Sequence, residues 1–327
     1  PLSIPLAVAA GVSPTTGLIT AIWAALIASI FGGSNYNIVG VTGALSGVIA
    51  SYALINGPAS VPMLAITAGL LILFAYLIRL EKYLIFIPSS VIHGFSLGIA
   101  LIIALNQFNF ALGLKNLAKH EKFIDNIFES FSNITNFSLT TFIIFLIFFF
   151  VLFIIRKKLP AIPGALIVSP IGILIGYLMT NNFIPFKIET LGDKFGEIKP
   201  VLIQIPSFMF TKTLFTTSLV IALIAILETL LSAKIADVAT KTKFNIRKEM
   251  FGLGLANIVS GIFGGIPATA ALARTAFNIK SGATNRISAT FCSLFIALGS
   301  FLFLSYFRFI PMAVIAAILV NVAINMI

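Results

Sequence analysis

Apolar runs long enough to cross a membrane recur along the chain and set its fold class. A helix needs roughly 20 apolar residues to cross a hydrocarbon core of about 30 Å. We expect membrane segments at residues 1–12, 15–32, 41–55, 60–80, 84–108, 138–156, 164–181, 213–233, 246–264, 267–279, 285–306 and 309–327. The short alternating segments of a membrane barrel do not occur in the sequence. The pattern therefore predicts an all-α polytopic membrane protein.

Composition excludes the main alternative classes. Charged residues make up 9% of the 327 residues, whereas soluble domains carry about a quarter. The one cysteine, Cys292, lies in an apolar run, so disulfides and thiolate metal sites have no support. No nucleotide-binding loop, metal-ligand cluster or nucleophile–base pair is present in the sequence. We expect neither an enzyme nor a metal or organic cofactor.

The net charge of +11 follows the expected topology. If the first segment runs outward from the cytoplasm, the inner connections hold twelve basic residues against three acids. The outer connections hold eight basic residues against six acids. This asymmetry fits the positive-inside rule and predicts a multi-pass protein of an inner or plasma membrane, with no nucleic-acid partner. Glu228 and Arg274 are the two charged residues that are not assigned to a connection.

A four-residue motif indicates an internal repeat. "IFGG" occurs at residues 30–33 and 262–265, and each copy is followed by a short apolar segment, 41–55 or 267–279. At about 1.5 Å per residue, neither segment crosses the membrane. The copies lie seven segments apart, so they enter from opposite sides, as in inverted-repeat transporters whose broken helices meet near the midplane. The alternative is coincidence, since glycine commonly ends a helix.

Several stretches resemble the sulfate permease (SulP) family of anion transporters. They are "PLSIPLAVAAGVSPTTGL" (1–18), "FGGSNYNIVGVTGAL" (31–45), "FIPSSVIHGFSLGIALIIALNQ" (86–107), "KEMFGLGLANIVSGIFGG" (248–265) and "PATAALARTAFNIKSGAT" (267–284). The resemblance implies a 7+7 inverted repeat of fourteen segments. A moving core domain then works against a gate domain. Twelve segments are found here, so we expect the last two of the fourteen to be missing from this sequence.

The resemblance also implies how one transmembrane domain, residues 1–327, is divided. The core comprises residues 1–80 and 213–306, and the gate comprises 84–181 and 309–327. A cytoplasmic STAS domain is expected to follow the C-terminus, and we expect a homodimer.

The two short segments predict an anion site. Helix N-termini present unpaired N–H groups and a positive dipole end, which favour an anion. The first turns are expected at Val41, Thr42, Gly43 and Ala44, and at Pro267, Ala268, Thr269 and Ala270. Small residues let the backbone approach a ligand, although they also serve helix packing in lipid.

Arg274 is the strongest single candidate in this site. Buried arginines are costly, and most face a cavity or mark a substrate path. The resemblance puts an arginine near the anion site within a motif matched by "ALARTAFN", in which Ala273 adjoins Arg274. It also implies that Ser3 and Leu6 line the site. The alternative role for Arg274 is a structural partner of Glu228 or of backbone carbonyls.

Glu228 is the lone acid within a membrane segment. Burial favours the neutral form of a carboxyl group, which suits Glu228 to take up and release a proton. The resemblance links this position to the coupling ion and gives Ser232, one turn later, a nearby hydroxyl. We favour H⁺ coupling, with Na⁺ bound at Glu228 and Ser232 as the alternative.

Together these features predict a secondary active transporter of sulfate, bicarbonate, chloride or a dicarboxylate, most simply a proton symporter. Rival functions are a Na⁺-coupled symporter, a passive anion channel and a non-transporting scaffold. A nucleobase–cation symporter of the same fold would be expected to carry acids on segments 8 and 10, and segment 10 carries Arg274 instead.

Overall fold

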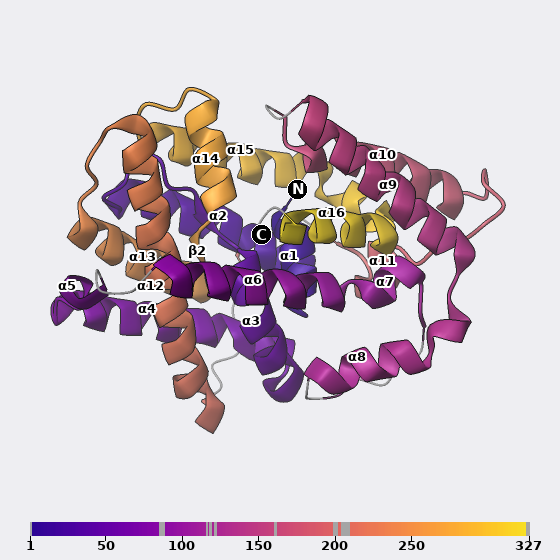
Figure 1. Cartoon of the computed structure of the whole chain (residues 1–327), viewed down its shortest axis with the longest axis horizontal. Coiled ribbons are helices and arrows are strands. Elements are labelled where there is room, and N and C mark those ends of the chain that lie inside the picture. The colour runs from indigo at the N-terminus through magenta and orange to yellow at the C-terminus, as the bar shows by residue number, and fades with distance from the viewer. Residues whose placement is uncertain are drawn as a thin grey trace.

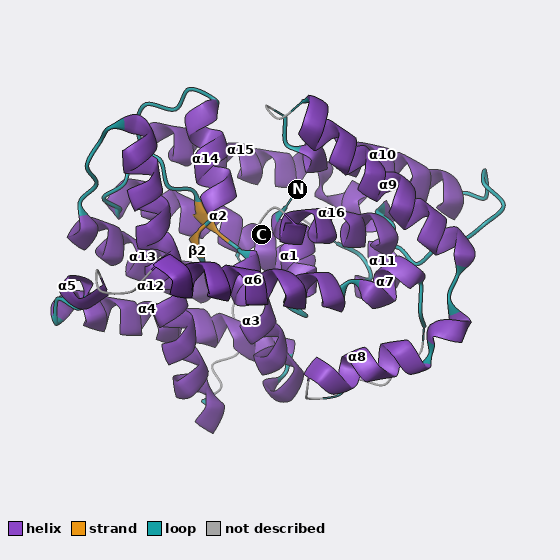
Figure 2. Cartoon of the chain, in the orientation of Figure 1, coloured by secondary structure: helices purple, strands orange, loops and turns teal. Residues whose placement is uncertain are grey.

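The computed structural model describes residues 2–84, 89–115, 117, 120, 123–159, 162–198, 202–203 and 210–324, and helices dominate them (Figure 2). Each of the twelve predicted segments contains a helix. These helices are α1 (Ser3–Ala9), α2 (Pro14–Phe31), α3 (Gly43–Asn56), α4 (Val61–Leu77), α6 (Ser89–Asn106), α9 (Leu139–Lys158), α10 (Gly164–Thr180), α12 (Lys212–Thr240), α13 (Ile246–Ile262), α14 (Leu272–Lys280), α15 (Ile287–Phe303) and α16 (Met312–Ile324).

Shorter helices fill the connections. They are α5 (Glu81–Leu84), α7 (Phe108–Leu112), α8 (Phe123–Ser132) and α11 (Leu191–Phe195), with 3-10 turns at Pro58–Ser60, Ile134–Asn136 and Leu304–Phe309. Helix α8 lies at the edge of the molecule, apart from the main body (Figure 1).

Side-chain caps explain where several long helices begin. Ser13 accepts a hydrogen bond from the Thr15 N–H ahead of α2, and Pro14 takes the first helical position, where a missing N–H costs nothing. Asn245 caps α13 in the same way by accepting from the Lys248 N–H at 3.0 Å. Helix α12 continues to Thr240, beyond the predicted end at residue 233, and stops where Lys241 adopts φ +57°.

The helices pack in two groups. Helix α13 packs on α2 and α4, and α12 packs on α4, α3 and α14. Helix α16 packs on α9, α6 and α7, and α10 packs on α9 and α16. Figure 1 shows the first group on one side of the molecule and α7, α9, α10 and α11 on the other, with α6 and α16 between them. The division into a mobile core and a gate stays a prediction.

A two-stranded antiparallel sheet, absent from the all-helical prediction, joins the two expected half-helices. Strand β1 (Val39–Gly40) pairs with β2 (Thr269–Ala270), with Val39 opposite Ala270 and Gly40 opposite Thr269. Helix α3 follows β1 and α14 follows β2. The sheet therefore brings the starts of two helices together, although more than 200 residues separate them in the chain.

The first turn of the second half-helix lies later than predicted. Thr269 and Ala270 belong to the extended strand β2, and α14 begins at Leu272 with Ala271 as its N-cap. The reason is tertiary, since pairing with β1 holds this stretch of small residues extended. The first half-helix lies close to its expected place, because α3 begins at Gly43 with Thr42 as its N-cap.

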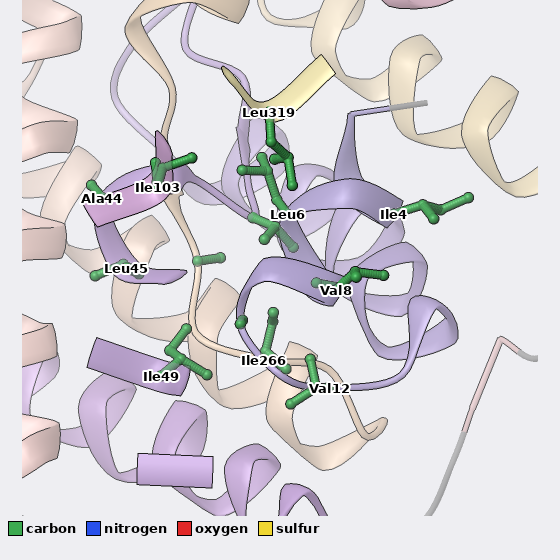
Figure 3. Packing of buried hydrophobic residues seen from close by; sticks show 14 of the residues in the cluster. Ile4, Leu6, Val8, Val12, Ala44, Leu45, Ile49, Ile103, Ile266 and Leu319 are labelled. Carbon is green, nitrogen blue, oxygen red and sulfur yellow. The ribbon is translucent and has the colours of Figure 1, made fainter. Parts of the chain in front are cut away.

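A continuous apolar core surrounds this junction. Leu6 of α1, Ala44 of α3, Ile103 of α6 and Leu319 of α16 belong to one cluster of buried residues (Figure 3). Large apolar side chains on the outer faces of α9 and α15 are exposed, as expected for lipid contact. Five helices of the described part are long and apolar enough to cross a membrane. The protein is a multi-pass membrane protein.

Candidate anion-binding site

A cavity of about 1000 Å³ opens where the two short helices begin. Its walls come from α1, α3, α12, α14, α15 and α16, and Pro163–Ala165 close one side. Eight of the residues expected at the site line this cavity: Leu6, Val41, Thr42, Gly43, Ala44, Glu228, Ala273 and Arg274.

No side chain caps either short helix. Thr42, the N-cap of α3, makes no capping hydrogen bond, and Ala271, the N-cap of α14, has no side-chain acceptor. The Thr42 hydroxyl instead donates to Glu228 Oε2 at 3.3 Å. A helix leaves its first N–H groups without intrahelical partners, so both helix starts can offer these donors and their positive dipole ends to an anion.

Arg274 joins the two repeats across the cavity wall. It projects from the first turn of α14, and its Nη2 donates to the Val41 carbonyl oxygen just before α3. This contact is one of the structural alternatives that the sequence left open, yet Arg274 also lines the cavity. Gly40 makes the approach possible, because a Cβ at that position would lie 2.9 Å from Arg274 Nη1. The guanidinium group is thus fixed at one end and faces the cavity.

Glu228 lies on α12, half-buried at the same wall. It accepts from Thr42, and Thr269 lies close to it as well. Among the described residues no direct ion pair joins Glu228 to Arg274, although the two charges attract each other across the site. A carboxyl group and a guanidinium group therefore stand on one cavity wall without neutralising each other by contact.

Six predicted site residues lie outside the cavity lining: Ser3, Pro267, Ala268, Thr269, Ala270 and Ser232. Ser3 is buried where α1 meets α2, since a Cβ on Gly17 would lie 2.5 Å from its carbonyl oxygen. The Thr269 hydroxyl donates to the Ala225 carbonyl, and the Ala270 N–H donates to Thr229 Oγ1.

Ser232, the last of these residues, is 1% exposed. Its hydroxyl donates to Asn37 Oδ1 at 2.9 Å and lies 3.1 Å from Thr275 Oγ1. The structure therefore does not bring Ser232 and Glu228 to the same surface of the cavity.

Sequence reasoning missed several residues of the lining. Asn278 of α14, Cys292 of α15 and Asn321 of α16 all contribute to the cavity wall. Asn321 stands out in retrospect as the one amide in the apolar helix α16. Gly40 had a weaker signal, a glycine within "IVGVTGALSG" just before the first short helix.

Comparisons with known proteins give a consistent result. The profile of the sulfate permease family matches residues 1–327. The putative sulfate transporter YvdB of Bacillus subtilis is 38% identical over 334 residues, which cover 100% of this chain and 62% of YvdB. The bicarbonate transporter BicA of a Picosynechococcus species is 29% identical, over 100% of this chain and 60% of BicA. The chain thus spans about three fifths of the length of these relatives.

Solved structures share the fold. The transmembrane domain of a cyanobacterial bicarbonate transporter BicA superposes with a TM-score of 0.83 at 23% identity, covering 100% of this chain and 84% of that chain. The structure of SLC26A9 gives a TM-score of 0.86 at 18% identity, covering 100% of this chain and 55% of that one. The inverted-repeat transporter architecture fits these structures.

Proposed function

Because the chain belongs to the sulfate permease family, we propose that it carries small anions across the membrane by secondary active transport. The observation that carries this proposal is the cavity, in which Arg274 and two helix starts without side-chain caps face one space. Each of these groups attracts negative charge. The relatives above are named as sulfate and bicarbonate transporters, which supports the same substrate class.

The anion binds between the start of α3, the start of α14 and Arg274. The N–H groups of the first helical turns donate to its oxygens, and Arg274 adds a full positive charge. Charge-assisted hydrogen bonds of this kind are about twice as strong as neutral ones. The Val41 carbonyl holds the guanidinium group in place, so little ordering of the side chain is needed when the anion arrives. Sulfate, bicarbonate, chloride and a dicarboxylate are the candidate substrates.

Movement of the core against the gate carries the site across the membrane. Residues of both groups line the cavity, with Arg274 and Thr42 on one wall and Ile318 and Asn321 of α16 on another. Separation of these walls opens the site to solvent, and their approach closes it. We propose that the transporter works as a homodimer.

Proton binding at Glu228 drives accumulation. A proton neutralises the carboxylate beside the anion and removes a repulsive charge from the site. Na⁺ prefers several oxygen ligands, and Ser232, the expected second ligand, is bonded to Asn37 away from the cavity. This arrangement favours H⁺ over Na⁺.

Uptake into proteoliposomes tests both parts of the proposal. Labelled sulfate, bicarbonate, chloride and succinate are supplied with an inward pH gradient, an inward Na⁺ gradient or neither. We expect saturable uptake of at least one anion that follows the pH gradient. Absence of saturable uptake for all four anions contradicts transport, and uptake that follows only Na⁺ contradicts the coupling.

Glu228→Gln separates coupling from binding. The amide mimics the protonated carboxyl group, so accumulation driven by the pH gradient should vanish while anion exchange persists. Asp125→Asn on α8 makes the same chemical change at an exposed position and should leave accumulation unchanged. Loss of pH-driven accumulation in both variants, or in neither, contradicts the role of Glu228.

A further inference from the structure

Glu249 is a buried carboxylate that the proposed transport mechanism does not use. It lies in the first turn of α13, is 4% exposed, and is absent from the cavity lining. At the start of the segment expected at 246–264, it counts among the charges of an inner connection, but the structure buries it against the loop after α2. Its Oε2 accepts from the N–H groups of Gly33 and Ser34, each at 2.7 Å, and its Oε1 accepts from Asn37 Nδ2 at 2.6 Å.

The loop after α2, which donates hydrogen bonds to Glu249, packs very close to neighbouring backbone atoms. A Cβ on Gly33 would lie 2.0 Å from the Asn245 carbonyl oxygen, and a Cβ on Gly32 would lie 2.3 Å from the Ala28 carbonyl oxygen. Arg286 donates to the Gly32 carbonyl at 3.0 Å and places a positive charge near Glu249. The first "IFGG" motif therefore lets the backbone reach a carboxylate on a helix of the other repeat.

The hydrogen bonds of Glu249 continue to the elements of the anion site. Asn37, oriented by Glu249, accepts from Ser232 of α12. Ser232 lies beside Thr275 of α14, and the Thr275 hydroxyl accepts from the Ile38 N–H at 3.2 Å. Ile38 directly precedes β1, so a continuous chain of contacts runs from Glu249 to β1, α12 and α14.

We propose that Glu249 is a positioning residue that sets the geometry of the anion site through the Gly32–Ile38 loop. This proposal rests on the proposed function, because the site in question is the one assigned to the anion. The loop fixes where β1 begins, and β1 leads directly to the Val41 carbonyl that holds Arg274 and to the start of α3. Glu249 touches no cavity surface and acts through these residues.

The loop requires both carboxyl oxygens of Glu249 as hydrogen-bond acceptors. Three N–H donors converge on its two oxygens, and a carboxylate accepts all three. A glutamine has one oxygen, so its NH₂ group must face either the Gly33 and Ser34 N–H groups or the Asn37 amide. If the Asn37 amide rotates to accept from it, Asn37 no longer accepts from Ser232 and no longer donates to the Thr229 carbonyl. Loss of one acceptor oxygen thus reaches the site through Asn37.

Cys292 supplies a reporter for the test, because this lone cysteine lines the cavity. The rate at which a small maleimide labels Cys292 is measured in detergent for wild type, Glu249→Gln and the matched control Glu129→Gln. Glu129 lies on α8 at the edge of the molecule (Figure 1), where its Oε2 is 3.6 Å from His120 Nε2. The sulfate concentration that half-protects Cys292 is measured next, and thermal unfolding is recorded for every variant.

We expect Glu249→Gln to fold, to change the labelling rate without sulfate, and to raise the half-protecting sulfate concentration about tenfold, because a displaced start of α3 and a displaced Arg274 fit the anion less well. Glu129→Gln should match wild type in all three readouts. A folded Glu249→Gln with unchanged labelling rate and unchanged protection overturns the proposal.

A second variant decides the question if Glu249→Gln does not fold. Thr275→Val keeps the side-chain shape but removes the hydroxyl that accepts from Ile38, and it should shift the same readouts in the same direction. A folded Thr275→Val that behaves as wild type overturns the proposal. Absence of protection of wild type by sulfate, bicarbonate, chloride or succinate counts against the proposed function, while the labelling rates still decide the role of Glu249.

Discussion

The two "IFGG" loops share four residues but are held by different chemistry. After α2, the loop meets the charged side chain of Glu249 and the guanidinium group of Arg286. After α13, the loop contacts only neutral side chains at these positions. Asn257 forms hydrogen bonds with the backbone N–H and carbonyl of Ala268, and the Thr20 hydroxyl does the same with the backbone N–H and carbonyl of Ile266. The two copies of the motif are thus held by different side-chain chemistry.

The glycines also serve different purposes in the two loops. Gly32 and Gly33 admit neighbouring backbone at close range. Gly264 adopts φ +86°, a conformation that glycine tolerates at little cost, and directs the chain away from α13 toward β2. The asymmetry extends to the helices that follow, because α14 carries Arg274 whereas the start of α3 offers only neutral groups.

The largest expected effect separates the glycines of the two loops. Gly33→Ala puts a methyl group 2.0 Å from the backbone oxygen of Asn245, which cannot rotate away, and should destabilise the protein by about 3 kcal/mol. In Gly265→Ala the nearest atoms are the hydroxyls of Ser260 and Thr20, at 2.3 and 2.7 Å. Side chains can move, so the cost should be nearer 1 kcal/mol. Thermal unfolding measures the loss of stability in each variant. Equal losses would contradict the proposed difference between the two loops.

Asn257→Ala should have an intermediate effect and tests how the neutral loop is held. Asn257 is fully buried and bonds Ala268 twice and Leu253 once. Its removal leaves buried backbone groups of Ala268 without these partners and should cost about 2 kcal/mol. The exposed Asn136→Ala is the control for the same change in composition. A melting temperature equal to that of the control would show that Asn257 does not hold the loop.

Thr42→Val should have the smallest effect, because it removes one hydroxyl while keeping the side-chain shape. The hydroxyl donates to Glu228 at 3.3 Å, a long hydrogen bond, so stability should fall by less than about 1 kcal/mol. We expect a modest change in how anion uptake depends on pH. Thr216→Val on the exposed face of α12 is the control. An unfolded Thr42→Val protein would mean that the start of α3 depends on this contact.

Much of the fold was predictable because each membrane helix is marked in the sequence by a long run of apolar residues. All twelve expected segments contain helices, and the two short ones lie where the repeated "IFGG" motif put them. Arg274 and Glu228 were predictable at the site because a charge in an apolar segment needs a polar surrounding. In each case the signal lies within one segment of the chain.

The remaining features depend on distant partners and left no local signal. The β1–β2 pairing joins residues that composition alone marks as small and apolar, and it shifts the start of α14 to Leu272. Ser232 lies one helical turn after Glu228, which predicts that the two side chains share a face, yet its hydroxyl donates to Asn37. From the sequence, Glu249 is assigned to a charged connection. Its burial follows only from the packing of α13 on α2 and on the loop after it.

Anion affinity of Arg274→Ala is the measurement that tests the central claim most directly. The matched control is Arg308→Ala, since Arg308 lies over the Phe309 ring, away from the cavity. For an anion that the wild type takes up, the half-saturating concentration should rise roughly 10- to 100-fold in Arg274→Ala, as loss of a charged hydrogen bond predicts, with folding retained. Arg308→Ala should match wild type. An unchanged half-saturating concentration in well-folded Arg274→Ala would remove Arg274 from the anion site and contradict the account.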